Sequence, residues 1–227
     1  MSLEIQNWGR VPYQDAWARQ KVLLEKRIGN EIPDVLIFCE HEPVITLGRA
    51  SQRDAAKAGH PAGHLTDGIV LPPSSKVQVL EVERGGHATY HGPGQLVAYP
   101  IFKLGRSAEV ANENHSRRGV LGLIRSLESW VAEYLKDFDL EAGTVEGKTG
   151  VWISQERKIA SIGIAARHWV SYHGIALNLS TGRSPWTWLN PCGFSPQVMT
   201  DIQLETGHLV PFSVAVDGLT RLVPKHF

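Results

Sequence analysis

Apolar residues along this chain recur mostly at the spacing of β-strands, with three stretches at the spacing of helices. Strands are predicted over residues 35–39, 44–47, 77–82, 95–101, 151–153, 158–164 and 170–179. The 3.6-residue period predicts helices over 15–28, 109–136 and about 213–222. Because strands outnumber helices and adjacent strands are joined by hairpins, we expect an α+β (α/β mixed) fold, a largely antiparallel or mixed sheet flanked by helices.

The segments between these elements differ in character. Residues 50–76 are irregular and rich in Gly, Pro, Ser and His, which predicts a long loop. Residues 143–150 predict a turn or mobile loop, and 180–200 a loop rich in Pro and Trp. Asp15 is a candidate N-cap of the first helix, and Gly29-Asn30 a candidate stop.

Composition narrows the class of protein. The 227 residues contain neither a repeat nor a clear linker, so we expect a single domain over 1–227. Lys plus Arg and Asp plus Glu both number 23, which argues against a nucleic-acid partner. No apolar run reaches the length of a membrane span, and the first residues lack a secretory pattern. Two cysteines do not make a disulfide framework, so we expect a cytoplasmic protein with reduced thiols.

Residues 84–95, Arg-Gly-Gly-His-Ala-Thr-Tyr-His-Gly-Pro-Gly-Gln, are the most informative segment. Its four glycines allow positive φ and let a ligand approach the backbone closely. Inward-turned backbone N–H groups beside Arg and His suit a polarised carbonyl or an anion. A β-hairpin turn would explain Gly92 to Gly94. It would not explain why Arg84, His87 and His91 gather here, so a ligand site is predicted.

Other candidates keep two interpretations each. Cys192 stands between Pro and Gly without apolar periodicity, and is either a nucleophile or an incidental surface thiol. Cys39 lies in an apolar run and is predicted to be a core residue. Lys158 opens a strand, where burial statistics favour a solvated end residue. His91 and His173 could be core histidines bonded to the backbone. No metal-binding spacing occurs, so no metal site is expected.

Together these segments resemble the lipoyl(octanoyl) transferase family. The matching motifs, in order and spacing, are Arg84–Gln95, Lys158–Gly163, His173–Asn178 and Pro191–Gly193, supported by Glu40–Gly48 and Gly150–Trp152. The resemblance runs from about residue 36 to 202. It implies a fold shared with biotin protein ligases and lipoate ligases.

The resemblance also implies an activity and its partners. Octanoyl would pass from octanoyl-acyl carrier protein to a lysine on lipoyl domains, those of 2-oxoacid dehydrogenase complexes and the glycine cleavage H protein. This is the first step of protein lipoylation. Cys192 would carry the acyl group as a thioester, Lys158 would assist it, His173 could support them, and no cofactor is implied. The acyl site would be lined by Arg84, Gly85, Gly86, His87, Ala88, Thr89, Tyr90, His91, Ser161, Ile162, Gly163, Gly174, Ile175 and Ala176.

Two other functions remain open. An ATP-dependent lipoate or biotin ligase would form an acyl-adenylate and would not need Cys192. The Pro-Cys-Gly and His-Gly-Pro-Gly motifs argue against it. A non-catalytic acyl- or carrier-binding protein would need neither Cys192 nor Lys158, and the presence of both argues against that function.

Overall fold

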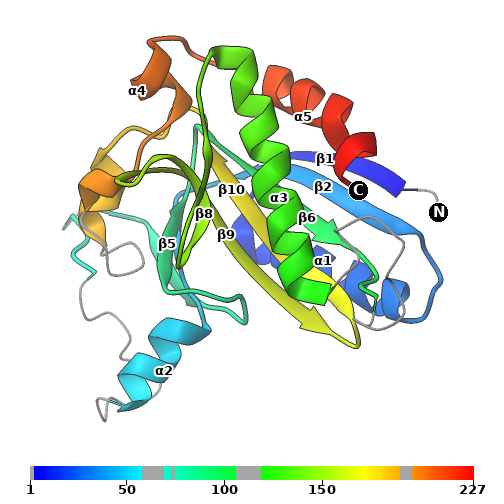
Figure 1. The fold of residues 1–227 in the computed structure, drawn as a ribbon. Helices are drawn as coiled ribbons and strands as arrows, with labels where there is room; N and C mark the ends of the chain where they lie inside the picture. The colour runs from blue at the N-terminus through cyan, green and yellow to red at the C-terminus, as the bar shows by residue number, and fades with distance from the viewer. Residues whose placement is uncertain (1–2, 58–68, 73–74, 106–118, 190–195) are drawn as a thin grey trace.

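The computed structural model describes residues 3–57, 69–72, 75–105, 119–189 and 196–227 (Figure 1). A seven-stranded sheet forms the centre, in the order β1-β2-β6-β10-β9-β8-β7. Its strands are β1 (Leu3–Val11), β2 (Asp34–His41), β6 (Gln95–Ile101), β7 (Gly143–Val145), β8 (Lys148–Ser154), β9 (Arg157–Arg167) and β10 (Val170–Asn178). Only the β1–β2 pair of this sheet is parallel. The expected mixed, largely antiparallel sheet is therefore confirmed.

Strand register in the middle of this sheet lines up small residues. Ala176 of β10 lies opposite Val97 of β6 and Ser161 of β9. Gly174 of β10 lies opposite Gly163 of β9. Because side chains alternate between the two faces of a strand, these residues share one face of the sheet.

A second sheet of three strands stands beside the first. It has the order β4 (Gln78–Glu81), β3 (Val44–Leu47), β5 (Ala88–His91), with β4 parallel and β5 antiparallel to β3. The glycine-rich segment was expected to be a loop between two flanking strands. Instead it contains β5, and the strands before and after it belong to different sheets. The segment therefore passes from one sheet to the other.

The structure describes five helices. They are α1 (Tyr13–Ile28), α2 (Arg49–Lys57), α3 (Gly119–Leu135), α4 (Ile202–Thr206) and α5 (Phe212–His226), with short 3-10 turns at Lys136–Phe138, Ser184–Trp188 and Pro196–Val198. α3 and α5 pack on one face and α1 on the other (Figure 1). Within the described ranges, no helix combines the length and apolar character needed to cross a bilayer.

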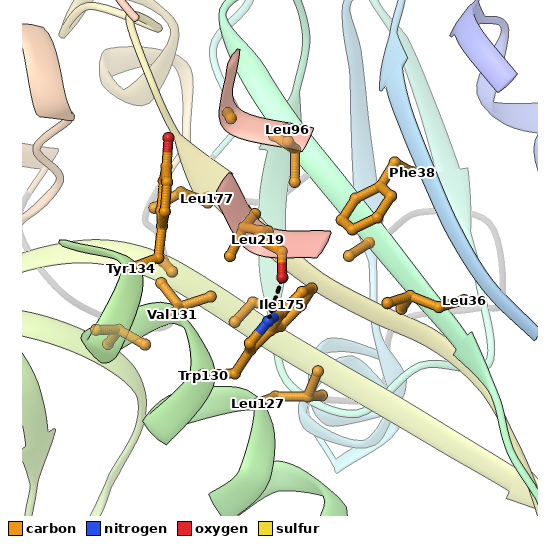
Figure 2. Close-up of a cluster of buried hydrophobic side chains, with 14 of the residues drawn as sticks. Leu36, Phe38, Leu96, Leu127, Trp130, Val131, Tyr134, Ile175, Leu177 and Leu219 are labelled. Carbon is orange, nitrogen blue, oxygen red and sulfur yellow. Dashed lines mark hydrogen bonds between the residues drawn. The ribbon is translucent and has the colours of Figure 1, made fainter. Parts of the chain in front are cut away.

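The core divides along the alternation of the strands. Figure 2 shows the cluster under α3 and α5, where Phe38 and Leu177 pack against Trp130 and its neighbours. The Trp130 indole N–H donates a 2.9 Å hydrogen bond to the Leu219 carbonyl, which joins the two helices. Cys39 faces the other side of the sheet, in the cluster under α1, and is fully buried. Its prediction as a core residue is confirmed.

Several local predictions were wrong for identifiable reasons. β1 was not predicted, because it is an edge strand with mostly exposed or half-buried side chains and therefore contains no apolar run. α2 occupies Arg49–Lys57, almost entirely within the expected long loop, and was not predicted because its sequence contains no apolar residue larger than alanine. Over 143–150, where a turn or mobile loop was predicted, β7 and β8 form a hairpin around a turn at 146–147. α1 begins after Pro12 without a side-chain cap, so Asp15 lies in the first turn and is not the N-cap. The part of the predicted helix over 109–118 lies outside the described residues.

Candidate functional site

A narrow cavity, with about 40 Å³ available to the centres of water-sized spheres, lies where the two sheets meet, on the α1 side of the large sheet. It is lined by Tyr13, Arg84, Gly86, Thr89, His91, Val97, Tyr99, Lys158, Ser161, Ile162, Gly163, His173, Gly174, Ile175 and Ala176. Three predicted motifs thus contribute to one cavity, although they are far apart in the chain.

Strand β5 presents only half of its residues to the cavity. Thr89 and His91 line it, as the alternation of a strand requires. Ala88 and Tyr90 pack on the opposite side, in a separate apolar cluster. The Tyr90 ring meets Trp186 edge-on, with centroids 5.8 Å apart. Ala88 and Tyr90, predicted as lining residues, are therefore placed where they position β5.

Arg84 and Gly85 fix the glycine-rich segment to both sheets. The buried Arg84 guanidinium donates to the Thr46 side-chain oxygen at 3.0 Å and to the Thr46 carbonyl at 2.6 Å. The Gly85 N–H donates to the Ile164 carbonyl of β9 at 3.2 Å. A Cβ at Gly163 would lie 2.9 Å from both Arg84 Cδ and the Gly85 oxygen. Glycine at 163 is therefore needed for the segment to approach β9 this closely.

His87 lies away from the cavity. Its side chain is 43% exposed, and its Nε2 is 3.2 Å from the Asp54 carboxylate on α2. The structure thus places this predicted lining residue at the surface, where it contacts the helix that the sequence did not predict.

Lys158 is the second residue of β9 and is only 4% exposed. The expectation of a solvated strand end is therefore wrong. Its Nζ lies 5.4 Å from the centroid of the Trp152 ring. A Cβ at Gly150 would come within 2.6 Å of Lys158 Cε, so the missing side chain leaves room for the lysine. Burying an ammonium is costly unless the protein compensates it, which marks Lys158 as a functional candidate.

The backbone of Lys158 is joined to the chain that follows residues 190–195. Thr200 N–H donates to the Lys158 carbonyl at 3.0 Å, and Met199 forms a parallel bridge with Lys158. On the other side of this segment, Leu189 is buried in the same cluster as Met199. Pro191, Cys192 and Gly193 themselves lie outside the described residues. The proximity of Cys192 to Lys158 stays a prediction.

A chain of side-chain hydrogen bonds leads from the cavity toward that segment. His91 Nδ1 is 2.7 Å from the Gln95 side-chain oxygen. The Gln95 amide donates to the Asn178 oxygen at 2.9 Å, and the Asn178 amide donates to the Thr200 carbonyl at 2.8 Å. Because the Gln95 oxygen can only accept, His91 must carry its proton on Nδ1. The lone pair of His91 Nε2 is therefore left to act as an acceptor.

Two further histidines are buried around the cavity. His41 Nδ1 donates to the Val11 carbonyl at 2.8 Å, so its Nε2 accepts from the Tyr99 hydroxyl at 2.6 Å. His173 lines the cavity, with its Nε2 3.7 Å from the Glu83 carboxylate. Among the described residues, no three His, Cys, Asp or Glu side chains are arranged to hold a metal ion.

Burial keeps these imidazoles neutral. It lowers the pKa of His41 to about 4 and holds the pKa of His91 well below its ordinary value. Burial also lowers the pKa of His173, although the neighbouring Glu83 acts in the opposite direction. Burial raises the pKa of the Cys39 thiol, which fits an inert core residue.

We expect the free energy of unfolding to fall as the pH is lowered from 7 to 5. Unfolded histidines take up protons near pH 6.5, whereas these buried ones do not, so acid favours the unfolded state. His41 alone should contribute a loss of about 2 kcal/mol over this interval. Urea unfolding at a series of pH values measures this loss of unfolding free energy. His41→Gln should flatten the dependence, while the exposed His208→Gln should not. A constant unfolding free energy between pH 7 and 5 in the wild type would contradict the assignment.

Three lining residues were missed from the sequence: Tyr13, Val97 and Tyr99. Val97 and Tyr99 alternate along β6, so their shared face could have been inferred once the strand was assigned. Tyr13 begins α1, and no local pattern connects it to a cavity whose other lining residues lie about seventy residues and more further along the chain.

The fold places the chain in the structural class of the lipoate protein ligases. A putative lipoate protein ligase from T. acidophilum superposes with a TM-score of 0.64 at 15% identity, covering 100% of this chain and 85% of the other. Lipoate-protein ligase A bound with ATP gives a TM-score of 0.63, also at 15% identity, covering 100% and 85%. At these identities the similarity concerns the fold alone.

The sequence comparisons identify the family. Residues 12–223 match the lipoyl protein ligase A/B catalytic domain, and the chain belongs to this family. An octanoyltransferase from Bdellovibrio bacteriovorus is 35% identical, with 96% of each chain covered. One from Syntrophotalea carbinolica is 37% identical over 94% of this chain and 88% of its own. The resemblance drawn from the motifs is confirmed, and the protein is an acyltransferase.

Proposed function

We propose that this protein transfers an octanoyl group from octanoyl-acyl carrier protein to the acceptor lysine of a lipoyl domain. A thioester on Cys192 is the intermediate. The observation that carries the proposal is the cavity beside the buried Lys158. The similarity of the chain to octanoyltransferases, at about one third sequence identity, supports the choice of octanoyl as the acyl group.

The cavity suits a saturated acyl chain at its centre. Val97, Ala176 and the backbone of β9 and β10 offer an apolar, partly side-chain-free wall. Each methylene taken out of water contributes about 0.8 kcal/mol, so an eight-carbon chain is bound mainly by burial. Backbone N–H groups of the glycine-rich segment are candidates for stabilising the carbonyl oxygen during reaction.

The reaction then proceeds through two exchanges at one carbonyl. The Cys192 thiolate attacks the donor thioester, the bond to the carrier sulfur breaks, and the carrier leaves as a thiol after taking a proton from the Lys158 ammonium. The acceptor lysine amine next attacks the acyl-Cys192, forming the amide and releasing the Cys192 sulfur. Neutral Lys158 accepts the proton that the amine loses. A thioester exchanged for an amide is downhill, so the chemistry needs no nucleotide.

Lys158 also favours the reactive form of the thiol. A free thiol with a pKa near 8.5 is only about a tenth ionised at pH 7.5. An ammonium ~4 Å away would stabilise the thiolate by up to ~4 kcal/mol at an effective dielectric of 20, before desolvation is subtracted. The two groups would titrate as a unit.

Mass spectrometry of the protein mixed with octanoyl-carrier tests the proposal. We expect one octanoyl group on Cys192, and its loss with formation of octanoylated lipoyl domain when that domain is added without ATP. A strict ATP requirement would make the protein a ligase. Binding without any covalent gain would make it a non-catalytic acyl-binding protein.

A further inference from the structure

Tyr13 separates the acyl cavity from a second, larger one. By the same measure the second cavity has a volume of about 380 Å³, and it is lined by Tyr13, Glu42, Val44, Lys76, Val77 and their neighbours. Most of these neighbours are exposed, so this cavity opens at the surface. Tyr13 lines both cavities and therefore lies between them.

Tyr13 is held rigidly. Tyr13 is 4% exposed and packs with Val44 and Val82 in a small apolar cluster. Its ring stacks on the His91 imidazole, with centroids 5.6 Å apart and planes at 18°. Its hydroxyl is 3.5 Å from His173 Nδ1. A residue fixed on several sides in this way sets a defined boundary to the cavity.

Tyr13 and Lys158 line the acyl cavity from different elements. Lys158 is on β9, and the cavity crosses β10 to reach Val97 and Tyr99 on β6. The Tyr13 ring lies 5.1 Å from the ring of His41, which ends β2, the next strand beyond β6. β9 and β2 are three steps apart in the sheet, with β10 and β6 between them.

We propose that Tyr13 sets the upper limit on acyl-chain length, as the end wall that an eight-carbon chain reaches when its carbonyl lies beside Lys158. The inference deepens the proposed function. Truncating the ring should join the two cavities and let chains longer than eight carbons continue into the second one. Tyr13 is thus a specificity-determining residue and takes no part in the acyl exchange.

The test compares octanoyl- and dodecanoyl-carrier as donors for wild type, Tyr13→Ala and Tyr13→Phe. For Tyr13→Ala we expect the ratio of kcat/KM for dodecanoyl over octanoyl to rise by about tenfold or more, because four extra methylenes become accommodated. Tyr13→Phe keeps the ring and should keep the wild-type ratio. Val77→Ala, which enlarges only the second cavity, is the matched control and should also keep it.

Calorimetric binding of free octanoate and dodecanoate to the same proteins tests the wall separately from catalysis. We expect dodecanoate affinity to rise in Tyr13→Ala and in the better-packed Tyr13→Leu, and to stay low in wild type and Tyr13→Phe. Unchanged length preference in both truncated variants, by rate or by binding, would overturn the inference. A wild type that binds octanoate but forms no octanoyl product would refute the proposed function alone.

Discussion

Cys192→Ala should reduce octanoyl transfer by about three orders of magnitude or more, because the thioester intermediate could no longer form. The neighbouring proline and glycine predict a turn, so the substitution should leave thermal unfolding nearly unchanged. Turnover of octanoyl-carrier with a lipoyl domain, measured beside the melting curve, checks both expectations. A Cys192→Ala protein that keeps most of its turnover would refute the covalent mechanism.

Cys39→Ala is the matched control for this experiment. Cys39 is fully buried under α1, with its sulfur 3.5 Å from His41 Nε2. Its removal should leave turnover nearly intact and cost roughly 1 kcal/mol of stability. Uptake of the acyl group by Cys39 would mean that the roles of the two thiols are reversed.

Lys158→Met should lower turnover by about 10²- to 10⁴-fold, since it removes both a cation beside the thiol and a proton acceptor. The apparent pKa for alkylation of Cys192 should rise toward the ~8.5 of a free thiol. Lys158→Arg retains the charge, so it should restore the low alkylation pKa. Its turnover should stay poor, because arginine does not release a proton at neutral pH. The gap left by Gly150 is also shaped to the lysine stem.

Iodoacetamide alkylation rates measured against pH separate these contributions. Wild type and Lys158→Arg should share one profile, and Lys158→Met should be displaced to higher pH. A profile unchanged in Lys158→Met would assign activation of the thiol to another group. His91 or His173, both buried beside the cavity, would then be the next candidates.

Apolar runs in the sequence predicted the central strands well. β3 and β6 begin and end where the pattern placed them, because buried strands carry almost only apolar residues. β1 could not be predicted in this way, since an edge strand is stabilised by pairing with β2 rather than by its own side chains. β5 was not predicted, because the glycines on either side of it indicated a loop.

The sequence motifs identified most residues of the candidate site, but they did not predict how these residues are arranged in space. Glycine-rich and Lys-Ile-Ala segments marked the residues that the fold gathers. The division of β5 into cavity and support residues depends on the second sheet, which no local pattern announces. The burial of Lys158 depends on Gly150 and Trp152, which follow from the β8–β9 hairpin rather than from composition.

β9 and β10 are joined by a two-residue turn, His168 and Trp169, both with positive φ. Tight turns of this kind fix the pairing of the strands they join. A one-residue insertion or deletion there would exchange the two faces of β10 relative to β9. Gly174 would no longer face Gly163, and the Ile175 side chain, which packs in the cluster under α3 and α5, would change face. The length of this surface turn therefore determines how the residues of the site on β9 and β10 are aligned. We expect the site to tolerate a change in turn length as poorly as a change in its motifs.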